Sequence, residues 1–285
     1  MKKKIIKIVV ILSFFVSLLI YFINLNNGSL ITKKINSLKI QKNKNYSYIA
    51  HAGGGLGEKT YTNSKEALIN SISLGYKLIE LDLMVTADKY IFASHGLEIF
   101  NSICHTSILS IKDLYLKDIK KCKLKNNLIF TILTEDEINQ VFLENKELIL
   151  ITDKIRDYKL LKKKFNFENR IIVETFSVSD YLYAKLIGIK NPMYYFKGRI
   201  INKFFISVFR PKIISISTKL VEEQNNFLKD YLKKKNLIFA FTSNNKKFND
   251  KYLNNSISAV YTDFWDIDNS RCYQLKSKPK LCDKY

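Results

Sequence analysis

The sequence lacks several patterns that would point to common functions. No G-x-G-x-x-G motif opens a helix, and the run Gly53–Gly55 has neither Rossmann nor Walker spacing, which argues against a dinucleotide or P-loop site. No C-x-x-C pair is present, so a zinc knuckle is not expected. Lysine and arginine exceed aspartate and glutamate, 47 to 26, for a formal net charge of +21. Because no stretch interleaves arginine with aromatic residues, we expect no nucleic-acid partner.

Length and apolar content indicate one large folded domain. The chain has 285 residues, of which 47% are hydrophobic, and this is enough for a sizeable core and argues against disorder. Barrels of the α/β class commonly use about 250 residues in one domain. The lysines are spread along the chain, so the surface would favour contact with anionic lipid head groups.

The N-terminal segment has the pattern of a membrane anchor. Four lysines, the last of them Lys7, precede the apolar run Ile8–Ile23, which is long enough for a short membrane span. A secretory signal peptide is the alternative, but no clear small-x-small cleavage site follows the run. We therefore favour an uncleaved single-pass anchor over residues 1–25, and a polar linker over 26–45. The domain from 46 to 285 is then expected to be extracytoplasmic, held at the cell membrane.

The four cysteines fall into two pairs that are close in sequence. Cys104 and Cys122 form one pair, and Cys272 and Cys282 form the other. In an extracytoplasmic domain these pairs are the natural disulfide candidates. Spacing alone does not choose among the three connectivities that four cysteines allow.

Short apolar runs alternate with helical patterns along the chain. Thr134 followed by Glu137 predicts a helix that begins with a capping box, and Asn63 with Glu66 predicts another that reaches Leu74. Strands that alternate with helices predict βαβ units, and eight such runs favour a closed TIM (β/α)8 barrel. The predicted strands are 48–50, 78–85, 90–94, 147–153, 170–174, 192–196, 212–217 and 237–242, and a last apolar piece covers 259–261.

Histidines and carboxylates stand at the ends of these predicted strands. His51 and His95 follow the first and third strands, and Asp153 ends the fourth. Glu80 and Asp82 are two residues apart on a strand, so both side chains leave by the same face. Because carboxylates so close repel each other, we expect a hard divalent cation such as Mg²⁺ or Ca²⁺ between them. Two histidines beside such a cation could divide general acid and general base work.

Three further polar residues are expected at the same barrel rim. Lys154 could place a positive charge beside a phosphate, although a surface lysine fits its position equally well. Asn63 opens a helix whose N-terminus could face an anion, while a capping role alone also explains it. Glu174 ends the fifth strand and is expected to point to the same mouth. His105 has no strand context and is treated as a bystander.

Taken in order, these motifs resemble the glycerophosphodiester phosphodiesterase family, which belongs to the larger group of phosphatidylinositol-specific phospholipase C-like barrels. The resemblance covers about residues 48–265, nearly the whole expected domain. Any single motif is weak, and the ordered set is specific. The motifs are H-A-G-G from His51, T-N-S around Asn63, E-L-D from Glu80, S-H at His95, T-D-K around Asp153, T-S-N ending at Asn244, and T-D ending at Asp263.

The resemblance implies a TIM barrel, a divalent cation and phosphodiester hydrolysis. The family often proceeds through attack by a neighbouring hydroxyl of the substrate, which gives a cyclic phosphate that water then opens. Carried over to this chain, the resemblance implies catalytic His51 and His95 and metal ligands Glu80, Asp82 and Asp153; we expect Lys154, Asn63 and Glu174 to bind substrate.

The sequence departs from the family pattern at three motifs. Ala52 stands where the family has an arginine that grips phosphate, and Thr62 stands where it has an acid. Asp153 is followed directly by Lys154, where the family has E-x-K. This divergent form predicts a substrate other than glycerophosphodiesters, and the lysine-rich surface and the expected anchor favour a phosphodiester of an anionic lipid or an envelope polymer. The alternative is a catalytically inactive barrel that binds envelope glycopolymer or lipid head groups.

Overall fold

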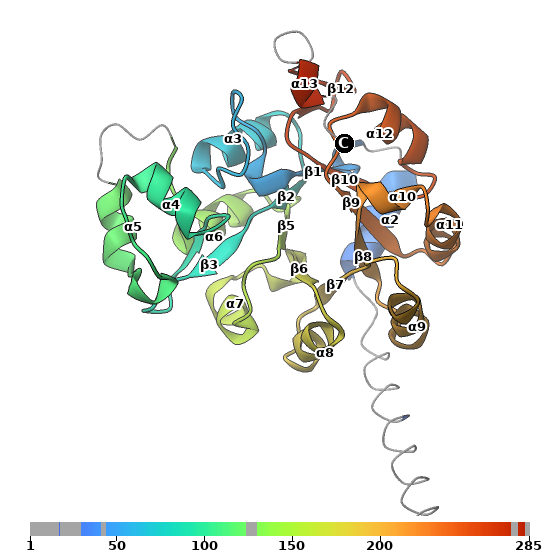
Figure 1. Cartoon of the computed structure of the whole chain (residues 1–285), viewed down its shortest axis with the longest axis horizontal. Coiled ribbons are helices and arrows are strands. Elements are labelled where there is room, and N and C mark those ends of the chain that lie inside the picture. Colours follow the sequence, from blue (N-terminus) through green and yellow to red (C-terminus); the bar gives the residue numbers. More distant parts are fainter. Residues whose placement is uncertain (1–16, 18–29, 41–43, 124–129, 275–278, 283–285) are drawn as a thin grey trace, which may run out of the picture.

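The computed structural model describes residues 17, 30–40, 44–123, 130–274 and 279–282, and its central feature is a closed barrel of eight parallel strands (Figure 1). The strand order is β1-β10-β9-β8-β7-β6-β5-β2, and β2 pairs with β1 to close the ring. The predicted (β/α)8 barrel is confirmed. The barrel strands are β1 (Tyr48–Ala50), β2 (Leu78–Glu80), β5 (Ile149–Thr152), β6 (Ile171–Thr175), β7 (Asn191–Tyr195), β8 (Ile213–Ser217), β9 (Leu237–Phe241) and β10 (Ala259–Thr262).

Helices connect the barrel strands and surround the ring (Figure 1). The predicted capping box at Thr134 is present, since the backbone N–H of Thr134 donates to Glu137 Oε2. The helices around the barrel are α3 (Lys65–Ser73), α6 (Glu135–Glu144), α7 (Tyr158–Lys164), α8 (Val178–Leu186), α9 (Ile200–Phe209), α10 (Thr218–Val221), α11 (Asn225–Lys233) and α12 (Lys246–Tyr252), and α13 (Pro279–Cys282) lies near the C-terminus. Outside the barrel, β11 (Trp265–Asp266) pairs with β12 (Arg271–Cys272).

The run predicted as the third barrel strand does not belong to the barrel. β3 (Leu83–Val85) and β4 (Ile91–Ala93) pair antiparallel, as a ribbon of their own. Five residues separate them, and a parallel crossover needs a dozen or more, so only a hairpin is possible. The eighth barrel strand is β10, of which the sequence indicated only an apolar piece.

An excursion beyond β3 fills the stretch that the sequence analysis treated as irregular. Helices α4 (Leu97–Cys104) and α5 (Leu116–Lys123) stand away from the barrel ring (Figure 1). With the β3–β4 ribbon they enclose a separate small core that includes Phe92 and Phe100. The Cys104–Cys122 disulfide joins the two helices, and Cys272–Cys282 is the second disulfide. Both candidate pairings are confirmed.

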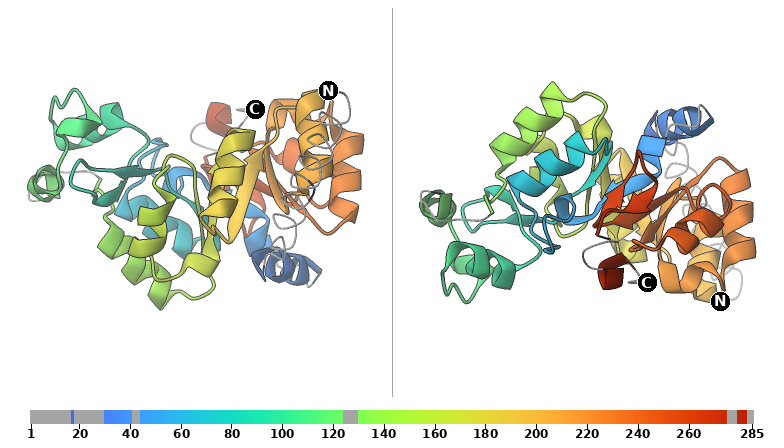
Figure 2. Two further views of the ribbon diagram at one scale, coloured as in Figure 1. Left: turned by 90° about the horizontal axis from the view of Figure 1, so that it is seen from below. Right: turned by 90° about the horizontal axis from the view of Figure 1, so that it is seen from above.

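Helix α2 (Leu30–Ile40) differs from the expectation of an irregular linker over 26–45. Its Ile31 and Ile35 are buried among side chains from the barrel interior. Asn36 Nδ2 donates to the backbone carbonyl of Lys235, which lies two residues before the start of β9. In both views of Figure 2 the helix lies at one end of the barrel. It covers the end where the strands begin, opposite to the end where the strands finish.

The predicted membrane anchor, residues 1–25, lies outside the described residues apart from Ser17. Across the described part of the chain, none of the helices combines the length and the hydrophobicity that a bilayer crossing requires.

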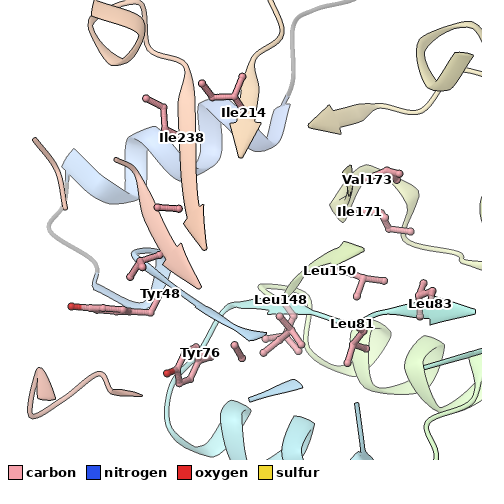
Figure 3. Packing of buried hydrophobic residues seen from close by; sticks show 14 of the residues in the cluster. Tyr48, Tyr76, Leu81, Leu83, Leu148, Leu150, Ile171, Val173, Ile214 and Ile238 are labelled. Carbon is pink, nitrogen blue, oxygen red and sulfur yellow. The ribbon is translucent and has the colours of Figure 1, made fainter. Parts of the chain in front are cut away.

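Two hydrophobic layers follow from the alternation of side chains along the strands. On β5, Ile149 and Ile151 point into the barrel, whereas Leu148 and Leu150 face the surrounding helices. Figure 3 shows part of the outer layer, with Leu148 and Leu150 near Leu81. The inward set fixes which face of each strand points to the barrel axis, and the polar residues at the strand ends continue that face.

Candidate active site

Three carboxylates converge where β2 and β5 end. Leu78 points inward from β2, and Glu80, the last residue of β2, continues that face. Asp82 lies in the break between β2 and β3, where the predicted single strand 78–85 divides in two. On β5, Ile151 points inward and Asp153 follows two residues later. The nearest oxygens of Glu80, Asp82 and Asp153 all lie within 4.8 Å of one another. The three side chains therefore lie together in the structure, as predicted.

Burial and mutual repulsion act on these carboxyl groups. Burial, followed by repulsion from Asp82 and Asp153, raises the pKa of Glu80 well above its usual value. The same two causes, burial and then the charge of Asp82, raise the pKa of Asp153 to about 6. Burial opposes ionisation of Asp82 as well, but hydrogen bonds from His95 and Asn63 outweigh it and lower its pKa. The cluster holds more negative charge than its surroundings neutralise.

Asn63 holds Asp82 and does not cap a helix. Its Nδ2 donates to Asp82 Oδ2 at 2.8 Å, and its Oδ1 accepts from the Asp82 backbone N–H at 2.9 Å. The N-cap of α3 is Ser64, which accepts from the backbone N–H of Ala67. Glu66 accepts from Thr131 instead of reaching back to the cap. Because Asn63 is fully buried, its contacts are those of a residue that orients Asp82.

His51 lies at the end of β1, in a turn that glycine makes possible. Its Nδ1 is 2.9 Å from Asp263 Oδ1. Asn244 steadies that loop, because its Oδ1 accepts from the backbone N–H groups of Asp263 and Phe264 and its Nδ2 donates to Asp263 Oδ2. Asn244 thus orients Asp263, and Asp263 in turn orients the imidazole of His51.

The glycine run after His51 meets a steric requirement. Gly54 has φ of 100°, and a Cβ there would lie 2.1 Å from Ser71 Oγ on α3. This close approach turns the chain so that the backbone N–H of Ala52 donates to Glu80 Oε2 at 2.6 Å. The turn therefore ties the first strand end to the carboxylate cluster.

His95 reaches the site from the loop after β4, not from a barrel strand as predicted. Its Nδ1 is 3.2 Å from Asp82 Oδ2, and this hydrogen bond is the main reason that the pKa of His95 is raised. The ring of Tyr61 lies between the two histidines, with its centroid 4.6 Å from each imidazole. Asn63, Asp82 and His95 thus repeat the asparagine, aspartate and histidine order seen at His51.

Lys154 and Glu174 complete the predicted set. Lys154 Nζ lies 3.7 Å from both Asp82 Oδ1 and Asp153 Oδ2. Glu174 is buried and accepts a short hydrogen bond from Ser215 Oγ, and burial raises its pKa to about 8. A cavity of about 420 Å³ adjoins His95 and Lys154 and is also lined by Lys89, Arg156 and the acid Asp157, which pairs with Lys89. Cations therefore border the site on the His95 side.

The donor set fits a hard divalent cation. Asp153 Oδ1 is buried and has no hydrogen-bond partner among the described residues. Glu80, Asp82 and Asp153 supply carboxylate oxygens, which are the ligands that Mg²⁺ and Ca²⁺ prefer. An unpartnered buried carboxylate oxygen between two other carboxylates is costly, and a cation there would remove that cost.

Three residues of the site escaped the sequence analysis. Asp263 and Asn244 lie in segments quoted for the family resemblance, but their link to His51 depends on the closure of β10 against β1. Tyr61 carried no sequence signal. Tyr261 is also notable, because its hydroxyl is buried inside the barrel without a hydrogen-bond partner in the described part of the chain. Strand alternation on β10 could have placed its side chain inward.

No protein-family model and no curated protein sequence matches this chain. Solved structures do match its fold. A glycerophosphodiester phosphodiesterase of Thermotoga maritima is 20% identical with a TM-score of 0.60, over 78% of this chain and 95% of that chain. A phosphodiesterase of Oleispira antarctica, solved with the product sn-glycerol-3-phosphate, is 17% identical with a TM-score of 0.62, over 84% and 97%. A glycerophosphodiester phosphodiesterase of Parabacteroides distasonis is 16% identical with a TM-score of 0.60, over 84% and 97%. At these identities the likeness shows a shared TIM-barrel fold.

Proposed function

We propose that this chain is a metal-dependent phosphodiester hydrolase of the glycerophosphodiester phosphodiesterase type. The observation that carries the proposal is the placement of His51 and His95 on two sides of Tyr61, next to three clustered carboxylates. Nδ1 of each imidazole forms a hydrogen bond with a carboxylate. The likeness of the fold to solved phosphodiesterases supports the same class of reaction.

The proposed cofactor is Mg²⁺ or Ca²⁺, held by Glu80, Asp82 and Asp153. Such a cation would stabilise the negative charge that develops on the phosphate oxygens. Lys154 lies beside two of these carboxylates and adds a positive charge at the same edge of the site. Asn63 keeps Asp82 in place, so we assign it a positioning role and not a contact with substrate.

The two histidines carry the proton transfers in this proposal. Because Nδ1 of each ring faces a carboxylate, Nε2 is the nitrogen that remains for the substrate. One imidazole removes the proton from the attacking hydroxyl, and the other gives a proton to the leaving oxygen. Asp263 and Asp82 fix the orientation of the rings, so that neither needs to reorganise during the reaction.

The proposed substrate is a phosphodiester of an anionic lipid head group or an envelope polymer. Lys89, Lys154 and Arg156 around the cavity beside His95 favour a substrate that carries negative charge. The product found in the Oleispira antarctica neighbour, a glycerol phosphate, is chemically related. The two disulfides support export of the domain, and the apolar N-terminal run supports a single-pass anchor in the cell membrane.

Hydrolysis of bis-p-nitrophenyl phosphate and of glycerophosphodiesters by the full-length chain tests the proposal. The assay is run with Mg²⁺, with Ca²⁺ and with EDTA. We expect EDTA to abolish turnover, and His51→Asn and His95→Asn to lower kcat by about 10²–10⁴-fold. His105→Asn is the matched control, because His105 is exposed and has φ of 49°, a conformation that asparagine tolerates.

Two results would contradict the proposal. One is turnover that survives both EDTA and the His51→Asn change. The other is the absence of turnover with every phosphodiester, together with lipid binding that His51→Asn leaves intact. The second result would identify an inactive barrel that binds head groups.

A further inference from the structure

One part of the fold carries only positive charge. From Tyr181 to Val221 the chain contains no aspartate or glutamate, although the whole protein has 26 of them. This stretch builds most of α8, then β7, α9, β8 and α10, so the positive charge is gathered in one sector of the barrel. Its basic residues are Lys185, Lys190, Lys197, Arg199, Lys203, Arg210, Lys212 and Lys219.

Helix α9 exposes large apolar side chains in the middle of this sector. The exposed fractions are 85% for Ile200, 62% for Ile201 and 64% for Phe204. The opposite side of the same helix packs on the barrel through Phe205 and Ile206, which are buried. Large apolar side chains that gather on one helix face and stay in water generally mark an interaction site.

Three cations surround this apolar face. Lys197 and Arg199 precede α9, and Lys203 lies one turn into it. None of the three forms an ion pair with another described residue. Lys203 Nζ lies 5.5 Å from the ring centroid of Phe227 on α11. The positive charges are therefore available to an external partner of negative charge.

A basic cavity of about 660 Å³ is lined by Lys203, Arg210, Lys212 and Lys234, with Asp230 as the one acid among its lining residues. Asp230 itself pairs with Lys233. A cavity with this excess of cations suits phosphate groups at the side of an apolar contact.

We propose that α9 docks on the surface of an anionic phospholipid bilayer. Ile200, Ile201 and Phe204 would enter the boundary between head groups and acyl chains, while the surrounding lysines and arginines bind the phosphates. A helix with an apolar face and a basic rim is typical of interfacial binding, and anionic lipid strengthens it. Such a bilayer offers hydrocarbon to the exposed apolar side chains of α9 and negative charge to the cations around them.

The docking face lies near the site mouth. Only residues 196–199 separate β7 from α9, so the start of α9 sits at the end of the barrel where the strands finish. Glu80, Asp82 and Asp153 meet at that same end. The basic cavity lies toward the other end of α9, where β8 and β9 begin, so docking would lay the side of the barrel along the bilayer with the mouth at one edge of the contact. The docking proposal does not depend on the proposed hydrolase activity, and its measurement uses no catalysis.

Tryptophan fluorescence of the full-length chain tests the proposal. A Phe204→Trp variant is reconstituted in vesicles of phosphatidylcholine, with or without phosphatidylglycerol, whose acyl chains carry bromine. The native Trp265 is buried and gives a constant background. We expect a blue-shifted emission and quenching at least about twofold stronger with phosphatidylglycerol present. Leu143→Trp on α6 is the control, because Leu143 is exposed but lies outside the acid-free stretch.

Charge reversal provides a second arm. Lys197→Glu, Arg199→Glu and Lys203→Glu, added to Phe204→Trp, should remove most of the phosphatidylglycerol effect. Lys117→Glu, Lys120→Glu and Lys121→Glu on α5 change the net charge equally and should leave it intact.

Three outcomes would overturn the proposal. The first is equal quenching of Phe204→Trp and Leu143→Trp, and the second is equal loss of the effect in both charge-reversed variants. The third is a blue shift in detergent without vesicles that grows with protein concentration, because a second copy of the chain would then cover α9.

Discussion

The imidazole of His51 is bonded to the carboxylate of Asp263, a residue 212 positions later in the chain, at a distance of 2.9 Å. The contact joins the turn after the first barrel strand to the loop after the last one. It can form only when β10 closes the ring against β1. Orientation of the candidate catalytic group is therefore a consequence of barrel closure.

Replacing Asp263→Asn should impair turnover more than binding. The amide keeps the shape of the carboxylate but no longer favours the tautomer with a proton on Nδ1, so we expect kcat to fall by about 10²-fold or more while KM changes little. Asp266→Asn is the control, since Asp266 accepts hydrogen bonds from the nearby Asn269 and lies outside the contact with His51. An equal loss in kcat and in thermal stability would instead indicate a structural role for Asp263.

Neutralising Glu80 should have opposite effects with and without metal. In EDTA, Glu80→Gln should raise the melting temperature, because it removes one of three clustered carboxylates and keeps the acceptor for the Ala52 N–H. Added Mg²⁺ or Ca²⁺ should stabilise the native protein by about 1–3 kcal/mol at concentrations well above Kd, and should leave the variant unchanged.

Thermal unfolding with and without cation measures both effects. Glu147→Gln is the matched control, because Glu147 pairs with Lys77 at the surface, away from the cluster. An equal cation response in native protein and Glu80→Gln would remove Glu80 from the proposed ligand set.

Glu174 should make the stability of the protein depend on pH. Burial raises its pKa in the folded state to about 8, from a usual value of 4.5. Folding therefore favours the protonated form, and the stability that this provides is complete below about 4.5 and is lost as the pH rises through 8. Glu174→Gln should be close to the native protein at pH 5 and more stable at pH 9 by on the order of 2–4 kcal/mol.

Denaturant unfolding at both pH values checks the Glu174 prediction. Glu144→Gln, on the exposed side of α6, should show no such pH-dependent gain. A gain at pH 5 as large as that at pH 9 would show that the effect is one of packing and not of charge.

Gly54 should tolerate no side chain. In Gly54→Ala the new Cβ would lie 2.1 Å from Ser71 Oγ, at φ of 100°, so we expect a loss of about 2–4 kcal/mol in the free energy of unfolding. Gly57→Ala shares a positive φ but has nothing within 4 Å of the new Cβ, so its loss should be about 1 kcal/mol. Similar losses in the two variants would mean that backbone conformation, and not the contact with Ser71, sets the requirement.

The features predicted well are those that local alternation determines. Inward-facing Ile151 on β5 fixes the direction of Asp153, and Leu78 on β2 fixes that of Glu80. The barrel was predicted from eight apolar runs, of which seven are barrel strands. The two disulfides join the cysteine pairs that are close in sequence, although spacing alone left three connectivities open.

The errors occur where distant segments decide the structure. The run before His95 looked like any other strand, and only the short gap after β3 made it a hairpin. By sequence Asn63 resembles a helix cap, but in the structure its side chain hydrogen-bonds to Asp82 and the N-cap is Ser64. Asp263 lies far from His51 in sequence, so no local pattern could have paired them. Helix α2 was missed because lysine and asparagine residues separate its apolar ones and because the side chains that cover it come from inside the barrel.

With the proposed membrane anchor, the position of α2 distinguishes two proteolytic cuts that would release the domain. Cleavage upstream of Leu30 would release a barrel that is still covered by α2. Cleavage just after Ile40 would separate α2 from the barrel and expose Ile49, Leu78 and Ile149 to water at the end where the strands begin. The released fragment would then be prone to aggregation, even though the barrel strands and the residues of the candidate site remained in place.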